Sequence, residues 1–147
     1  MKKDLIGKDA PVLAQAAGAS VPAGTQLLFA ETDASHAFVQ EEQMMPFLPI
    51  VRVRSFEDAV QRAFESELGY KHTSMIHTTN VERMTIMARK MDTTLFIKNG
   101  PCMSGLGLGG EGDLSYSIAT PTGEGVTNPK TFCRVRRCVM VDNLRIY

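Results

Sequence analysis

The middle of the chain alternates strand-length apolar runs with segments of helical periodicity, and this alternation constrains the fold more than any other feature. The runs Phe47–Val53, Thr73–His77 and Thr93–Ile97 have the length and composition of buried strands. Between them, apolar residues recur every three to four positions over residues 56–68 and 81–91, as in amphipathic helices. Strand, helix, strand, helix, strand at these lengths predicts an α/β fold, in which right-handed crossovers place helices over a parallel sheet.

The two central helices carry boundary signals at their ends. Ser55 stands before the first helix with Asp58 at its third position, as in a capping box, and Gly69 follows its last apolar residue. Thr79 or Asn80 is placed to cap the second helix, which we expect to end near residue 91.

The two ends of the chain are predicted from weaker patterns. Pro11 opens a short helix that Gly18 stops, and Thr25–Ala30 is a further apolar run of strand length. Residues 99–125 form a glycine-rich loop region, whereas residues 131–147 alternate well enough to form one or two extended strands. Because no helix covers such a strand pair, we expect it to seek the sheet edge of another subunit.

Composition and charge exclude several classes of partner. The chain has 147 residues, of which 44% are apolar, and its 16 Lys and Arg balance its 16 Asp and Glu. A chain without net charge has no global field for nucleic acid or an anionic membrane, and its apolar stretches fall far short of the ~20 residues that span a bilayer. The basic start runs into no long apolar core, so it is a poor signal peptide, and we expect a cytoplasmic protein.

The cysteines and histidines form no recognisable metal or catalytic pattern. Cys102, Cys133 and Cys138 lack metal-ligand spacing, so no metal is expected, and we interpret all three as reduced thiols. Cys102 follows a predicted strand on a loop, but no histidine lies near it in sequence, which is more typical of a small packed residue than of a nucleophile. His77 lies within an apolar run and is interpreted as a satisfied core histidine.

Two loops carry unusual residue combinations. Gly105–Gly110 matches the dinucleotide-binding pattern G-x-G-x-x-G, but the residues that follow are poor helix formers, and that site requires a helix. A glycine-rich turn that lets backbone groups approach closely is the favoured interpretation. Glu41–Pro46 places paired carboxylates before apolar residues and a proline, so it is either a binding motif or a solvated turn before a strand.

Taken together and in this order, four blocks resemble the aldehyde dehydrogenase superfamily: Glu41–Pro49, Asn99–Pro101, Gly105–Gly112 and Ala119–Gly125. The likeness is closest to the CoA-acylating propionaldehyde and acetaldehyde dehydrogenases of bacterial microcompartments, and it covers nearly the whole chain.

The resemblance implies the carboxyl-terminal third of such an enzyme. The fold expected is then the parallel-sheet part of the catalytic domain plus C-terminal oligomerisation strands. Residues 1–125 would form the C-terminal portion of the cysteine-bearing catalytic α/β domain, and residues 126–147 an extended strand tail that serves oligomerisation.

The resemblance also implies site residues. Glu42 aligns with the glutamate of the superfamily's E-x-F-G-P motif, which binds the nicotinamide ribose, and Met44 stands where that motif has its phenylalanine. We therefore expect Glu42 and Met44 to contact the cofactor. Leu108, Gly109 and Gly110 are similar to the F-G-G segment beside the aldehyde pocket, with an aliphatic residue replacing the aromatic one. A smaller apolar wall of this kind suits a short aliphatic aldehyde.

The activity implied is oxidation of a short-chain aldehyde with CoA and NAD to acyl-CoA and NADH, through a cysteine thioester. NAD and coenzyme A are thus the expected cofactor and co-substrate, and the expected assembly is a homo-oligomer, a dimer or a tetramer. A bacterial microcompartment is the finer location that the likeness implies. The family's nucleophile motif is not found among these residues, so no catalytic residue is assigned in this chain, and the chain alone is expected to be inactive.

Two alternatives remain open at this point. The chain could be a small self-sufficient α/β module that binds a nucleotide or phosphate without catalysis. It could also be a packing or regulatory subunit that joins a full-length partner through its terminal strands.

Overall fold

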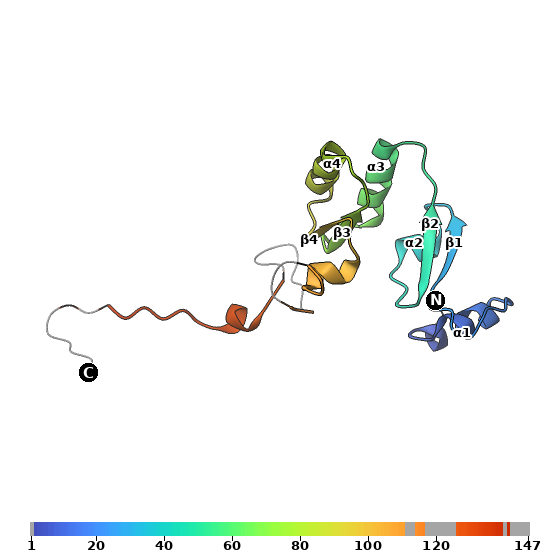
Figure 1. The fold of residues 1–147 in the computed structure, drawn as a ribbon, viewed down its shortest axis with the longest axis horizontal. Helices are drawn as coiled ribbons and strands as arrows, with labels where there is room; N and C mark the ends of the chain where they lie inside the picture. The colour runs from blue at the N-terminus through green and yellow to red at the C-terminus, as the bar shows by residue number, and fades with distance from the viewer. Residues whose placement is uncertain (1, 111–113, 117–125, 140, 142–147) are drawn as a thin grey trace. The chain divides into compact units, whose positions relative to one another are not determined.

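The computed structural model describes residues 2–110, 114–116, 126–139 and 141, and these residues divide into two compact units. The first unit comprises Met1–Lys71 and Thr78–Asp92, and the second comprises His72–His77 and Thr93–Tyr147. Figure 1 shows their helices and strands along the chain. The first unit holds η1 (Lys3–Leu5), α1 (Ala10–Ala16), β1 (Leu28–Thr32), α2 (Ala37–Gln40), β2 (Phe47–Val51), α3 (Phe56–Ser66) and α4 (Val81–Met91). The second holds β3 (Thr73–Ile76), β4 (Leu95–Lys98), η2 (Cys102–Leu106) and η3 (Pro129–Phe132).

In the first unit, β1 and β2 form a parallel pair in which Leu28 lies opposite Phe47 and Phe29 lies opposite Leu48. Side chains alternate between the two faces of a strand, so the pair has two different faces. Leu28 and Phe47 line a cavity beside η1 and α1, whereas Phe29 and Leu48 are 68% and 52% exposed. One face of this parallel pair therefore lies against the cavity, whereas the other exposes the large apolar side chains of Phe29 and Leu48.

The helices of the first unit begin where the capping residues predict. The Ser55 hydroxyl oxygen accepts a hydrogen bond from the Asp58 amide at 3.1 Å, and Asn80 Oδ1 accepts from the Arg83 amide at 3.0 Å. These bonds satisfy amides that a helix N-terminus otherwise leaves unpaired. The helices α3 and α4 pack against each other, with Arg83 lying 5.2 Å from the centre of the Phe56 ring. The two predicted central helices are thus confirmed.

In the second unit, β3 and β4 form another parallel pair, with Thr73 opposite Leu95. A hydrogen bond of 2.7 Å joins the hydroxyls of Ser74 and Thr93, and Ile97 is buried. The short helix η2 packs against β4. The approach is close enough that a Cβ added to Gly105 would lie only 3.0 Å from the Ile97 side chain.

The α/β class with parallel strands is confirmed, but the strands form two separate pairs instead of one sheet. Within the described part of the chain, β2 pairs only with β1, and β3 only with β4. The predicted strand Thr25–Ala30 is displaced to Leu28–Thr32, and the four-residue helix α2 was not predicted. Hydrophobic periodicity indicates where strands lie in the sequence, but it does not indicate which strands pair with each other.

Two predictions on individual segments have different outcomes. His77 lies one residue beyond β3 and is exposed, so its interpretation as a core histidine within a strand is wrong. Among residues 126–139 and 141, the structure places η3 at Pro129–Phe132 and gives Cys133–Val139 no regular structure. A strand requires a partner edge, so an oligomerisation strand in this tail stays a prediction. In the described ranges, no helix combines the length and apolar character that crossing a membrane requires.

Candidate functional site

The loop between α2 and β2, residues 41–46, carries the two predicted cofactor contacts. Glu42 is exposed, and Met44 is 69% exposed with a backbone φ of 48°. A positive φ is uncommon for a residue with a Cβ and must be held by its surroundings. The loop thus presents a carboxylate and a thioether to solvent from a constrained backbone. We call residues 41–46 the acidic loop.

The acidic loop is held in place by hydrogen bonds on both sides of Met44. The buried amide of Gln43 donates to the Glu41 carbonyl at 2.6 Å and to the Ala37 carbonyl, at the start of α2, at 3.5 Å. The Gly7 amide donates to the Met44 carbonyl at 3.1 Å, which ties the loop to the segment after η1. Glu42 therefore stands on a loop whose backbone is anchored at several points.

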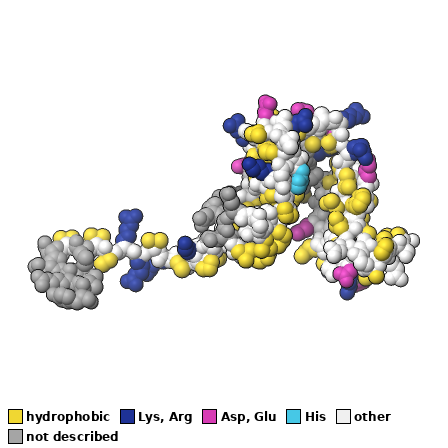
Figure 2. Space-filling view, in the orientation of Figure 1, with side chains coloured by type: hydrophobic (Ala, Val, Ile, Leu, Met, Phe, Trp, Pro, Cys, Tyr) yellow, Lys and Arg dark blue, Asp and Glu magenta, His cyan; other side chains and the backbone are white. Residues whose placement is uncertain are grey.

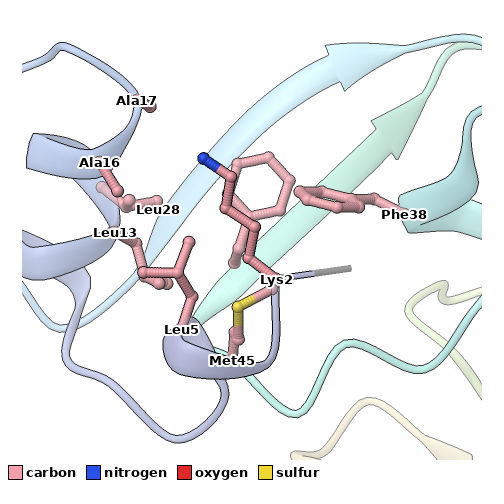
Figure 3. A pocket seen from close by; sticks show the side chains of 9 residues that line it. Lys2, Leu5, Leu13, Ala16, Ala17, Leu28, Phe38 and Met45 are labelled. Atoms are coloured by element: carbon pink, nitrogen blue, oxygen red, sulfur yellow. The ribbon is translucent and has the colours of Figure 1, made fainter.

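An apolar cavity of about 560 Å³ lies next to this loop (Figure 3). Met45 and Phe38 line it from the loop and α2, and the rings of Phe38 and Phe47 meet edge to face at 5.4 Å. Lys2 is the one charged residue among those lining it. Neither the cavity nor α2, which forms part of its wall, was predicted from the sequence. The lining also includes Leu5, Leu13, Ala16, Ala17 and Leu28.

The predicted substrate segment Leu108–Gly110 is a tight turn that follows η2. Gly107 and Gly109 have φ values of 89° and 74°, which favour glycine. A Cβ on Gly110 would overlap the carbonyl oxygen of Ser104 and lie 3.0 Å from its carbonyl carbon. The close backbone approach expected of a glycine-rich turn is thus present, and it leaves the Leu108 side chain 41% exposed.

The two sets of predicted site residues belong to different units. Glu42 and Met44 belong to the first unit, whereas Leu108, Gly109 and Gly110 belong to the second. The resemblance block at 119–125, and residues 111 and 112 of the preceding block, lie outside the described residues.

The thiols offer no assembled catalytic group. Cys102 begins η2 and is exposed, as are Cys133 and Cys138, and all three are free. Over the described ranges, no group of three or more His, Cys, Asp and Glu side chains is arranged to hold a metal ion.

A charged pair marks the other end of the β1–β2 pair. Arg52 Nε and Nη2 donate to the two carboxylate oxygens of Glu31 at 2.9 and 2.8 Å. These hydrogen bonds and the guanidinium charge hold the pKa of Glu31 below its usual value and raise the pKa of Arg52. Glu31 lies near the carboxyl end of β1 and Arg52 directly follows β2, whereas the acidic loop precedes the amino end of β2. The charged pair and the acidic loop therefore lie at opposite ends of the strand pair. Figure 2 shows side chains of both charges on the face that it draws.

Parallel strand pairs with helical crossovers define the class of the protein as an α/β protein. The model of the aldehyde dehydrogenase family matches residues 15–112, which include the acidic loop and the glycine turn. The chain belongs to the aldehyde dehydrogenase family.

Among curated relatives, the acetylating acetaldehyde dehydrogenase EutE of Salmonella typhimurium is 51% identical over 99% of this chain. The CoA-propanoylating propanal dehydrogenase of the same organism is 45% identical over 98% of this chain. In both cases the chain spans about 31% of the relative's length.

Solved structures agree with the fold. A propionaldehyde dehydrogenase of Rhodopseudomonas palustris, with bound CoA and an acylated cysteine, matches 92% of this chain and 31% of its own, at 48% identity and a TM-score of 0.86. A propionaldehyde dehydrogenase from the fucose utilisation microcompartment of Clostridium phytofermentans matches 98% of this chain and 33% of its own, at 42% identity and a TM-score of 0.89.

Proposed function

We propose that this chain acts as part of a longer CoA-acylating aldehyde dehydrogenase, which converts a short aliphatic aldehyde, CoA and NAD to acyl-CoA and NADH. The observation that carries the proposal is the 51% identity, over 99% of the chain, to an acetylating acetaldehyde dehydrogenase. The match to the R. palustris enzyme with bound CoA supports the same co-substrate. When bound, NAD would supply the hydride acceptor for this reaction.

The role proposed for Glu42 is to hold the nicotinamide ribose. An ionised carboxylate can accept two hydroxyl hydrogen bonds at once, and the neighbouring hydroxyls of a ribose offer that pair of donors. Glu42 is exposed, so it can reach a ligand, and the anchored loop limits the freedom it loses on binding. Met44, on the same loop, would add an adaptable apolar contact.

The role proposed for Leu108, Gly109 and Gly110 is to form a wall of the aldehyde pocket. The turn brings its backbone against Ser104 and leaves Leu108 partly exposed. An aliphatic side chain on a rigid turn provides apolar contact without a hydrogen-bonding group, which suits a short alkyl chain.

The open surfaces of the first unit support action within a longer polypeptide. The face of β1 and β2 that carries Phe29, Leu48 and Ile50 is exposed, although parallel strands are ordinarily covered on both faces. No large side chain in the described ranges is completely buried. The apolar composition of this face supports its burial in the full-length enzyme.

Two further proposals concern the assembly of the enzyme and its location in the cell. We infer that residues 126–147 join copies of the enzyme into a dimer or tetramer, because their strand pattern needs a partner edge. A cytoplasmic location within a bacterial microcompartment is supported by the origin of the C. phytofermentans relative. A native mass measurement of the full-length enzyme tests the assembly, and a monomer would contradict it.

Replacing Glu42 tests the cofactor role. In the full-length enzyme, Glu42→Ala is expected to raise the KM for NAD by roughly tenfold to a hundredfold, the size expected for losing hydrogen bonds to a charged group. The measurement is initial rate against NAD concentration at saturating aldehyde and CoA. Glu41→Ala is the matched control, because Glu41 is an exposed carboxylate on the same loop. Equal NAD dependence in Glu42→Ala and the unchanged enzyme would remove Glu42 from the site.

A further inference from the structure

Gln43 is a buried polar side chain between two exposed residues of the acidic loop. It is 8% exposed, whereas its neighbours Glu42 and Met44 face solvent. Burying an amide is unfavourable unless its hydrogen-bonding groups find partners, so a glutamine at this position needs a reason.

The hydrogen-bond partners of Gln43 show which segments its side chain joins. Its Nε2 donates to the Glu41 carbonyl within the loop and to the Ala37 carbonyl of α2. The same Ala37 carbonyl accepts the Glu41 amide at 2.9 Å, so one oxygen at the start of α2 holds both Glu41 and Gln43 of the loop. The orientation of the amide follows from these contacts, because the reversed amide would direct Oε1 at two carbonyl oxygens.

The other atom of the amide, Gln43 Oε1, is buried and has no hydrogen-bond partner among the described residues. An unpaired buried acceptor opposes folding, and an apolar residue of similar size would avoid that cost. The sequence nevertheless has an amide here, which indicates that its two donated hydrogen bonds hold the loop in a way that apolar packing alone would not.

We propose that Gln43 is a positioning residue, which fixes the backbone of the acidic loop so that the Glu42 carboxylate is held toward the cofactor. The inference rests on the proposed role of Glu42 in binding NAD. The two donated bonds restrain the residues on either side of Glu42, and the Gly7 amide restrains the loop one residue further on, at Met44. With the donors removed, Glu42 would sample several orientations and would lose that freedom only on binding.

A matched control exists in the same part of the chain. Gln40, the last residue of α2, also donates from Nε2 to a backbone carbonyl, that of Ala34, at 2.7 Å. This bond ties α2 to the preceding loop and does not touch residues 41–46. Gln40→Leu therefore removes the same kind of interaction without releasing Glu42.

The experiment compares Gln43→Leu, Gln43→Glu and Gln40→Leu in the full-length enzyme, by fluorescence titration with NADH, kcat and thermal unfolding. Gln43→Leu should weaken NADH binding by roughly threefold to tenfold, as expected for lost neutral hydrogen bonds, while kcat changes by less than about twofold. Gln40→Leu should leave NADH binding unchanged. Gln43→Glu keeps the size but directs carboxylate oxygens at two carbonyls, so binding should be weak at high pH and recover in part as the carboxyl gains its one proton and donates one of the two hydrogen bonds.

Unchanged NADH binding in Gln43→Leu would overturn the proposal, and so would equal losses in both leucine variants accompanied by equal drops in melting temperature. If Gln43→Leu does not fold, the pH dependence of NADH binding by Gln43→Glu decides, and a flat dependence overturns it. The Glu42→Ala variant distinguishes a failure of the cofactor role of Glu42 from a failure of the positioning role of Gln43. If that variant binds NADH normally, the cofactor role of Glu42 fails, whereas a normal Gln43→Leu beside a defective Glu42→Ala removes only the positioning role.

Discussion

The chain produced alone is expected to form no NADH when it is given propionaldehyde, CoA and NAD. Acyl transfer through a thioester needs an activated thiolate, and none of these residues matches the family's nucleophile motif. Cys102 begins η2 as an exposed, free thiol, and exposure alone does not activate a thiol. Because the covalent step has no substitute, the expected effect is complete loss of turnover.

The measurement is absorbance of NADH over time with the purified chain. The positive control is the Salmonella acetaldehyde dehydrogenase relative, with the 31% of its length that matches this chain replaced by these residues. That hybrid should be active. NADH formation by the pure chain would contradict the prediction, and tight binding of NAD or CoA to it in calorimetry would favour a self-sufficient binding module.

The helices α3 and α4 were predictable because their boundary signals are local. Ser55 and Asn80 accept hydrogen bonds from amides three residues ahead, and that geometry depends only on the nearby chain. The limits of β1 were not predictable in the same way. The apolar run begins at Thr25, but the strand begins at Leu28, whose amide donates to the Pro46 carbonyl, and Pro46 lies far along the sequence. A strand begins and ends where its partner does.

The candidate site likewise has a part that the sequence predicted and a part that it did not. Glu42 and Met44 were expected from the resemblance to the family and the glycine turn from its residue pattern, and the close approach at Gly110 agrees with the expectation for a glycine-rich turn. The burial of Gln43 was not predicted, because a glutamine between exposed residues gives no sequence signal of its environment. The roles of these residues in binding cofactor and aldehyde stay predictions.

Replacing Gly110 is expected to have the second largest effect, because the obstacle is backbone and cannot rotate away. In Gly110→Ala the new Cβ would overlap the Ser104 carbonyl oxygen, so either the turn or η2 must move. Overpacking of this kind costs about 1–3 kcal/mol of unfolding free energy. If the displacement reaches Leu108, kcat/KM for a short aldehyde should also fall, by roughly tenfold or more, since each ~1.4 kcal/mol of lost transition-state stabilisation is a factor of ten.

Two other glycines separate the overlap from other effects of adding a methyl group. Gly109 has a φ of 74° but open space around its Cβ position, so Gly109→Ala should cost about 1–2 kcal/mol through backbone conformation alone. Gly24 has neither a positive φ nor an atom within 4 Å of that position, so Gly24→Ala should be close to neutral. Denaturant unfolding and aldehyde kinetics of the three variants in the full-length enzyme give both readouts. An effect of Gly110→Ala no larger than that of Gly24→Ala would mean that the turn does not lie against Ser104, and the proposed aldehyde wall would lose its structural basis.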